Sequence, residues 1–153
     1  MTPISTELVI DAPPTRVFEI ITDLDRYSEW NRFTPRISLA TRDLRVGAEL
    51  DLDCQMTETS LLRGEHEVIL AFDRQRLVFS MGTSRTRGRP GITSERVQRC
   101  EPHNAGTRFV NSEQFTGALA PLVYLLYARK LEAAASRYCA DLKARAEGDV
   151  RWA

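Results

Sequence analysis

The stretch from residue 48 to residue 56 reads AELDLDCQM, and its side chains alternate between apolar and polar at every step. Because successive side chains of a β-strand point to opposite faces, this alternation predicts a strand with one dry face and one wet face. The dry face carries Ala48, Leu50, Leu52, Cys54 and Met56. Such a strand is typical of an antiparallel sheet that covers a core on one side only.

Two further strands are predicted after this stretch, on either side of a polar turn at residues 73–76. A four-residue hairpin loop would set Phe72 opposite Leu77 and Leu70 opposite Phe79. In this register the apolar side chains share one face, which comprises His66, Val68, Leu70, Phe72, Leu77, Phe79 and Met81. We therefore expect an antiparallel meander in the middle of the chain.

The segment before the meander predicts one strand and two short helices. Residues 4–10 alternate and indicate the strand, and the Asp-Ala-Pro-Pro sequence at residues 11–14 marks a change of period. Helical spacing then places four apolar residues on one side, namely Val17, Phe18, Ile20 and Ile21. The second short helix is expected from Leu24 to Trp30, and residues 31–35 break the pattern.

The segment after the meander predicts a loop, two more strands and a long helix. Residues 83–91 contain three arginines beside Gly and Pro, which favours a mobile solvated loop and leaves an anion site as the alternative. Strands are expected at residues 92–102 and 106–116, and a helix from residue 118 to about residue 146. One side of that helix carries Tyr124, Ala128, Leu131, Ala135, Tyr138 and Leu142.

The last two strands break the apolar pattern. A turn centred on residues 104–105 sets Arg96 opposite Glu113, Gln98 opposite Asn111 and Cys100 opposite Phe109. Phe109 and Phe115 mark this face as the inner one, so charged and amide groups would enter an apolar interior. Burial of such groups costs free energy unless they are paired or hydrogen-bonded. They form either a structural ion pair or a polar patch for a ligand, unless the register shifts and both charges face water.

Composition excludes several classes of function. The 153 residues fit one domain, residues 1–153, and the 21 basic residues balance the 21 acidic ones, so we expect no nucleic acid as a partner. No leader pattern and no long apolar stretch are present, which favours a cytoplasmic protein without membrane insertion. The three cysteines and two histidines lack metal-ligand spacing, so no metal and no cofactor are expected.

The sequence also lacks the common catalytic motifs, including the nucleophile elbow, the phosphate-binding loop and the zinc-protease helix. His66 would lie opposite Cys54 if the preceding turn were centred near Ser60. A histidine packed in the core beside a buried thiol is the favoured interpretation of this pair, because no third group that would orient the histidine is evident.

The segments at residues 11–33 and 106–122 resemble the SRPBCC/START-like superfamily. The first one matches the superfamily pattern at Ala12, Pro13, Val17, Phe18, Asp23, Tyr27, Trp30, Asn31 and Phe33, whereas Arg32 replaces the usual proline. The resemblance implies an α+β helix-grip fold, in which a curved antiparallel sheet of about six or seven strands wraps round a long C-terminal helix. Relatives include lipid carriers, hormone receptors, aromatase/cyclases and chaperone activators, so the fold alone does not fix an activity.

We therefore carry three hypotheses. The first is binding of a small hydrophobic molecule in a cavity whose expected lining is Trp30, Phe33, Leu50, Leu52, Val68, Leu70, Phe79, Met81, Phe109, Phe115, Leu131, Ala135 and Tyr138, with Arg96, Gln98, Asn111 and Glu113 at its polar end. The second is a polyketide cyclase/dehydrase-type enzyme, with Arg96, Glu113, Tyr124 and Tyr138 as candidate proton-transfer residues. The third is a chaperone-regulating module with a protein partner and a filled interior. The oligomeric state stays open.

Overall fold

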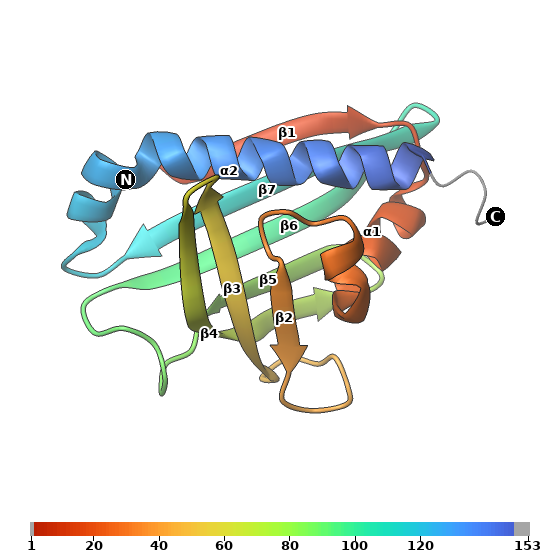
Figure 1. Ribbon diagram of the computed structural model, residues 1–153. Coiled ribbons are helices and arrows are strands. Elements are labelled where there is room, and N and C mark those ends of the chain that lie inside the picture. Colours follow the sequence, from red (N-terminus) through yellow and green to blue (C-terminus); the bar gives the residue numbers. More distant parts are fainter. Residues whose placement is uncertain (1, 149–153) are drawn as a thin grey trace.

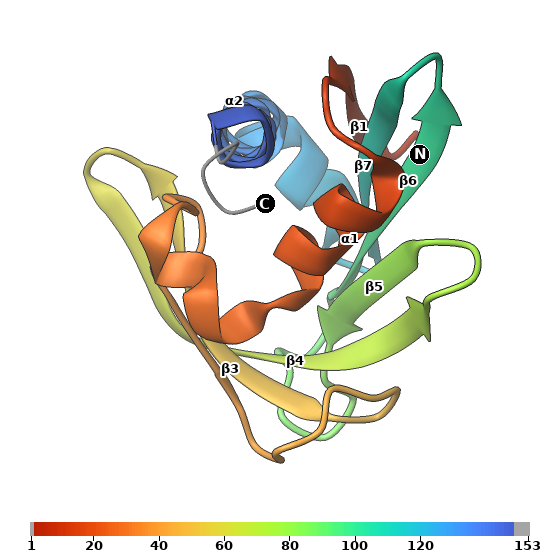
Figure 2. The ribbon, with the colours of Figure 1, turned by 90° about the vertical axis from the view of Figure 1, so that its right-hand side faces the viewer.

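A computed structural model describes residues 2–148 of the chain. One seven-stranded antiparallel sheet has the strand order β1-β7-β6-β5-β4-β3-β2, and it curves around the long helix α2, Ala120–Gly148 (Figures 1 and 2). The strands are β1 Ile4–Ile10, β2 Arg36–Leu39, β3 Glu49–Thr57, β4 Ser60–Asp73, β5 Val78–Thr83, β6 Thr93–His103 and β7 Gly106–Thr116. This architecture is the helix-grip fold expected from the sequence.

Two short helices follow β1, as predicted. Helix α1, Pro14–Thr22, starts with proline at a position where a missing backbone N–H is tolerated, and it buries Val17, Phe18 and Ile21. The second is a 3-10 helix, η1, Leu24–Glu29. The Tyr27 hydroxyl of η1 donates a hydrogen bond to the carbonyl oxygen of Ile21. This contact joins the two helices inside the core.

Strand β2 was not predicted, because its four residues are too few to show a period. It pairs with β3, where Arg36 lies opposite Asp53. Arg36 donates from Nε and Nη2 to the two carboxylate oxygens of Asp53 at 3.0 Å each, and Asp53 also accepts the Gly64 N–H at 2.9 Å. The bond from Arg36, followed by that from Gly64, lowers the pKa of Asp53 to about 2. Asp53 therefore connects β2, β3 and β4.

The predicted register of the β4–β5 hairpin is wrong. Phe72 pairs with Phe79 rather than with Leu77, because the turn occupies residues 74–77 and places Leu77 in the left-handed region with φ 53°. A β-bulge then follows between Ile69 and Ala71. The bulge adds one residue to β4, so Ile69 is fully buried whereas Leu70 is 41% exposed.

The predicted pairing of His66 with Cys54 is also wrong. His66 lies opposite Asp51, and Cys54 lies opposite Leu62. The β3–β4 turn uses only residues 58–59, and register shifts on both sides of Cys54 move the pairing further. The Cys–His arrangement considered from the sequence therefore does not form.

The predicted register of β6 and β7 is confirmed. Arg96 pairs with Glu113, Gln98 with Asn111 and Cys100 with Phe109. Asn104 adopts a φ of 51° in the turn, a conformation that asparagine tolerates better than most residues. The polar groups of this pair therefore do enter the concave side of the sheet.

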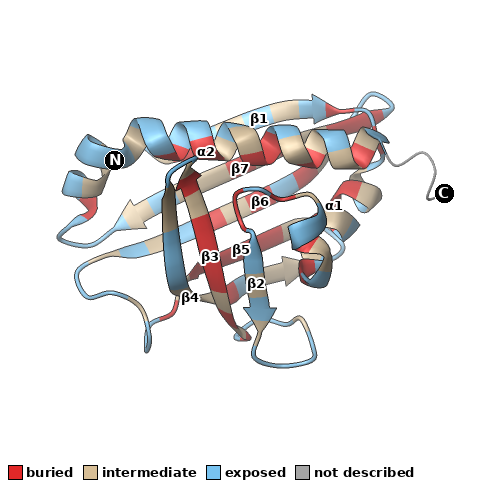
Figure 3. Cartoon of the chain, in the orientation of Figure 1, coloured by how far each residue is buried: buried red, intermediate tan, exposed pale blue. Residues whose placement is uncertain are grey.

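Buried residues recur along one side of helix α2, where the cartoon in Figure 3 is coloured red. This stripe comprises Leu131, Ala134, Tyr138, Cys139, Leu142 and Ala146, so Ala134 takes the buried position expected for Ala135, which is only partly covered. Arg32 joins the loop after η1 to this helix, because its Nε and Nη2 atoms donate hydrogen bonds of 2.7–3.0 Å to the two carboxylate oxygens of Asp141. None of the helices within residues 2–148 has the length and apolar character needed to cross a membrane.

Candidate functional site

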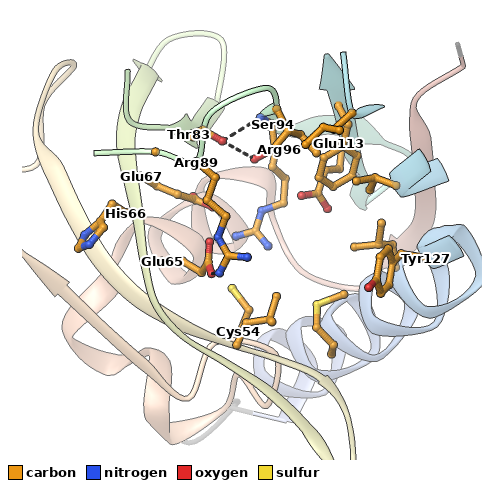
Figure 4. A pocket seen from close by; sticks show the side chains of 18 of the residues that line it. Cys54, Glu65, His66, Glu67, Thr83, Arg89, Ser94, Arg96, Glu113 and Tyr127 are labelled. Atoms are coloured by element: carbon orange, nitrogen blue, oxygen red, sulfur yellow. Dashed lines mark hydrogen bonds and ion pairs between the residues drawn. The ribbon is translucent and has the colours of Figure 1, made fainter. Parts of the chain in front are cut away.

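A cavity of about 590 Å³ lies between the first turns of α2 and the concave side of the sheet (Figure 4). Its walls come from β3, β4, β6, β7, α2 and the β5–β6 loop, residues 84–92. The apolar part of the lining includes Phe33, Leu52, Cys54, Met56, Leu62, Ile92, Phe115, Leu122, Val123, Leu126 and Leu131.

The ionisable side chains that line this cavity include three from three strands that act on one another electrostatically, namely Glu67 of β4, Arg96 of β6 and Glu113 of β7. Glu65, His66, Arg87, Arg89 and Lys130 line the cavity as well. Figure 4 shows Arg96 and Glu113 reaching into the space from neighbouring strands. Arg96 is only 8% exposed. The cavity therefore combines an apolar wall with a buried charge.

The Arg96 guanidinium has few partners. Its Nε atom has no hydrogen-bond partner among residues 2–148, and its Nη2 atom lies 4.0 Å from the sulfur of Met81. The bidentate Arg96–Glu113 ion pair considered from the sequence does not form within the described residues, although the two residues are register partners. Instead the guanidinium carbon lies 5.5 Å from the ring centre of Phe33 and 5.1 Å from that of Tyr138.

Partial burial changes the acidity of the carboxyl groups of Glu67 and Glu113. Loss of solvation raises the pKa of Glu67 to about 7, and the nearby charge of Arg96 limits this rise. Burial raises the pKa of Glu113 as well, again against the effect of Arg96. Near neutral pH the cavity therefore contains a permanent cation and a carboxyl group, Glu67, that exchanges its proton readily.

The mouth of the cavity is bordered by the β5–β6 loop and by the start of α2. Arg89 of the loop forms an ion pair with Glu65 at 2.5 Å, and Arg87 forms one with Asp51 at 3.2 Å. Asp51 also bonds Nδ1 of His66, which borders the cavity. The loop arginines thus have carboxylate partners on β3 and β4.

The two borders of the mouth are joined directly. The Leu119 N–H donates a hydrogen bond of 3.0 Å to the carbonyl oxygen of Gly91. Gly91 has a φ of +81°, and a Cβ atom there would lie 3.3 Å from the Leu119 side chain. Glycine at this position permits the close approach of loop and helix.

A second polar group lies deeper, between α2 and the sheet. The Tyr138 hydroxyl donates a hydrogen bond of 2.7 Å to the side-chain oxygen of Gln98, and both residues are fully buried. Gln98 Nε2 and Asn111 Oδ1 have no hydrogen-bond partner among the described residues. These groups belong to the packed interior and do not line the cavity.

The structure separates the predicted lining residues into three groups. Six of them line the cavity, namely Phe33, Leu52, Arg96, Glu113, Phe115 and Leu131. Others pack outside its lining in or against the core, namely Trp30, Leu50, Phe79, Met81, Gln98, Phe109, Asn111, Ala135 and Tyr138. Val68 and Leu70 instead line a separate groove bordered by Glu49, Glu95 and Gln114, because the bulge reverses the phase of β4.

Two of the candidate proton-transfer residues also lie outside the cavity lining. The Tyr124 hydroxyl accepts the N–H of Phe115 at 3.1 Å, and the Tyr138 hydroxyl is bound to Gln98. Arg96 and Glu113 remain as candidates that face the cavity.

The sequence analysis missed Glu67. Glu65, Glu67 and Ile69 form an alternating series of their own, but it is less apolar than the competing series His66, Val68 and Leu70. The less apolar series, Glu65, Glu67 and Ile69, faces inward, because the bulge between Ile69 and Ala71 reverses the alternation of β4 before Phe72. Within residues 2–148 no cluster of three His, Cys, Asp or Glu side chains could hold a metal ion.

Residues 1–147 match the family described as polyketide cyclase / dehydrase and lipid transport. The chain belongs to this family. The SRPBCC/START-like recognition made from residues 11–33 and 106–122 is thereby confirmed. No curated protein matches the sequence of this family member.

Solved structures show how widely the polyketide cyclase/dehydrase and lipid-transport fold is shared. The protein TTHA0849 from Thermus thermophilus is 16% identical with a TM-score of 0.77, over 97% of this chain and 99% of that one. The Zhui aromatase/cyclase from Streptomyces sp. R1128 is 16% identical with a TM-score of 0.71, over 95% and 93%. The di-domain ARO/CYC BexL is 12% identical with a TM-score of 0.73, over 94% and 45%. At these identities the likeness establishes the fold.

Proposed function

We propose that this protein binds a small hydrophobic molecule with one polar end, such as a lipid, a polyketide or an aromatic metabolite, in the cavity between α2 and the sheet. The observation that carries this proposal is the buried guanidinium of Arg96, whose Nε has no hydrogen-bond partner in residues 2–148 at the edge of an apolar space. A buried donor without a partner costs about 1–3 kcal/mol. A polar group on a ligand would recover that cost.

The size and border of the cavity support the same proposal. Its volume of about 590 Å³ lies within the range of roughly 300–1,000 Å³ that is usual for small-molecule sites. Leu122 and Leu126 line it while remaining 51% and 56% exposed. Exposed leucines at a mouth are consistent with passage of an apolar molecule.

Native mass spectrometry of gently purified protein tests this proposal, followed by solvent extraction and identification of any bound molecule. We expect a stoichiometric apolar passenger, or uptake of a hydrophobic fluorescent probe by protein that is empty. Protein that carries no passenger and takes up no probe would overturn the proposal.

A second candidate function is an enzyme of the polyketide cyclase/dehydrase type. The observation that favours it is Glu67, whose pKa of about 7 suits an acid-base group near neutral pH and which faces the same cavity as Arg96. Turnover of a poly-β-keto thioester, followed by chromatography of the products, distinguishes an enzyme from a carrier. Loss of turnover in Glu67→Gln with retained binding would favour the enzyme, whereas binding without turnover would favour the carrier.

The chaperone-regulating alternative expects a filled interior, and the cavity of about 590 Å³ weighs against it. A cytoplasmic location and a protein partner stay predictions from the sequence.

A further inference from the structure

Three ionisable groups of the cavity, Glu67, Arg96 and Glu113, point to a particular kind of polar end. We propose that the cavity selects molecules whose polar end is an acid, and that Glu67 takes up a proton when the ionised acid binds to Arg96. This inference rests on the proposed function, because it requires that the cavity hold an apolar molecule.

The first step concerns geometry. A guanidinium presents five N–H donors in one plane, and two of them can bind the two oxygens of a carboxylate side by side. In Arg96 the Nε donor has no partner in the described chain, and the Nη2 atom has only a sulfur at 4.0 Å. The rings of Phe33 and Tyr138 lie beside the guanidinium and provide no oxygen to its Nε. A carboxylate, or the paired oxygens of an ionised β-diketone, can use two guanidinium donors side by side, whereas a single hydroxyl group uses one.

The second step concerns charge. The charges that act on Glu67 are Arg96 on β6, Glu113 on β7 and Glu65 on its own strand. Glu67 in turn acts on the Cys54 thiol of β3 and on the Tyr27 hydroxyl of η1. Glu65 is paired with Arg89 at the mouth. Besides burial, the negative charge of Glu113 raises the pKa of Glu67, so Glu113 is the carboxylate that remains near Arg96 when Glu67 carries its proton. Glu113 forms no ion pair with Arg96 within residues 2–148, which leaves guanidinium donors for an anion. An anion gains a charge-charge interaction with Arg96, whereas an alcohol gains an ordinary hydrogen bond.

The third step concerns the proton. Two negative charges in one poorly solvated site repel each other, and this repulsion favours protonation of one of the two groups. A bound carboxylate on Arg96 would therefore raise the proton affinity of Glu67 further. Above pH 7 Glu67 is ionised in the empty protein, so binding takes up as much as one proton from solvent. Well below pH 7 Glu67 already holds its proton, so no uptake follows.

The affinity for an ionised acid should therefore fall as pH rises. Each bound proton makes the observed affinity fall by up to about tenfold per pH unit above the pKa of the empty site. Decanol carries no charge and does not alter Glu67, so its affinity should change little.

Isothermal titration calorimetry with decanoic acid and with decanol, below their aggregation limits, tests this inference at about pH 6 and about pH 8.5. Each titration is repeated in two buffers of different ionisation enthalpy, which counts the protons exchanged. We expect decanoic acid to bind at least tenfold more tightly than decanol at the lower pH. At the higher pH this advantage should shrink at least tenfold, and close to one proton should be taken up per acid bound.

Two variants assign the effect to residues. Glu67→Gln should abolish the proton uptake and retain tight binding of decanoic acid at the higher pH. Arg96→Met should remove the preference for the acid and retain binding of decanol. Glu58→Gln, which makes the same chemical change in an exposed turn, should behave as the unmodified protein does. The acid-alcohol comparison on unmodified protein stands even if Arg96→Met does not fold.

The outcomes separate the two proposals. Equal affinity for decanoic acid and decanol at both pH values would overturn the selection of acids and leave the proposed function intact. Acid preference without proton uptake at the higher pH would overturn the role of Glu67. Failure of both molecules to bind, together with failure of the fluorescent probe, would overturn the proposed function itself.

Discussion

Tyr138 on α2 and Gln98 on β6 are joined by a hydrogen bond of 2.7 Å between two fully buried side chains. This bond connects the middle of the long helix to the centre of the concave face of the sheet. The Tyr138 ring also lies 5.1 Å from the guanidinium carbon of Arg96, so the same residue supports one wall of the charged cluster.

Replacement of Tyr138 by Phe should destabilise the protein by about 1–3 kcal/mol, because the buried oxygen of Gln98 loses its donor while the ring remains in place. Urea denaturation followed by circular dichroism measures this change. Tyr127→Phe is the matched control, since Tyr127 is 46% exposed, and its effect should stay within about 0.5 kcal/mol. Equal losses in the two variants would contradict the prediction.

Replacement of Leu131 by Trp should block uptake of the hydrophobic probe, because Leu131 lines the cavity and a larger ring would occupy it. Leu125→Trp is the control. Leu125 lies on the same helix, is 79% exposed and does not line the cavity, so probe uptake should be unchanged. Probe fluorescence measures uptake, and circular dichroism confirms that each variant is folded. Undiminished uptake by folded Leu131→Trp would place the probe elsewhere.

The pKa of Glu67 should make the free energy of unfolding depend on pH. Its folded-state pKa of about 7 lies above the usual 4.5, so the folded protein retains the proton over a range in which the unfolded chain has lost it. This group therefore reduces stability as pH rises from about 4.5 to about 7, and the reduction stays constant above that range.

Glu67→Gln should consequently leave stability nearly unchanged at pH 5 and raise it by about 1–3 kcal/mol at pH 8. Urea denaturation at the two pH values measures the difference between variant and parent. Glu58→Gln in the exposed β3–β4 turn should show no such difference between pH values. A Glu67→Gln effect that is the same at both pH values would refute the pKa assignment.

The contact between Arg32 and Asp141 should hold the loop after η1 against α2. Asp141→Ala removes an acceptor for the Arg32 side chain and for its backbone N–H, which is bound at 3.1 Å. The midpoint of thermal unfolding should drop by a few degrees. Glu132→Ala, at an exposed position of the same helix, should leave the midpoint almost unchanged. Differential scanning calorimetry measures both midpoints. An equal decrease in Asp141→Ala and Glu132→Ala would contradict a stabilising role of the Arg32–Asp141 contact.

The sequence was most informative where turn chemistry and strand period agree. Asn104 marks the β6–β7 turn, and the register that it implies placed Arg96 opposite Glu113 correctly. Likewise the Asp-Ala-Pro-Pro segment located the end of β1 and the start of α1. Local rules suffice at such positions because the turn is determined by the residues that form it.

The rest depends on interactions that are remote in sequence. Periodicity cannot locate the bulge after Ile69, and one inserted residue exchanges the two faces of β4. Leu70 was therefore assigned inward, and Glu67 was missed. The short strand β2 pairs with β3, and its Arg36 contacts Asp53, a residue 17 positions later in the chain. The cavity itself depends on how far α2 extends over the curved sheet, which no local pattern records.

The hydrogen bond between Leu119 and Gly91 has a kinetic consequence for anything that passes through the mouth. This bond joins the β5–β6 loop to Leu119, the residue directly before α2. Neither border of the mouth can therefore move outward alone while the bond persists. Widening of the mouth would require the bond to break or both segments to move together. Entry and escape of a bound molecule would then share one rate-limiting opening event, and residence time would respond to changes at either residue in the same way.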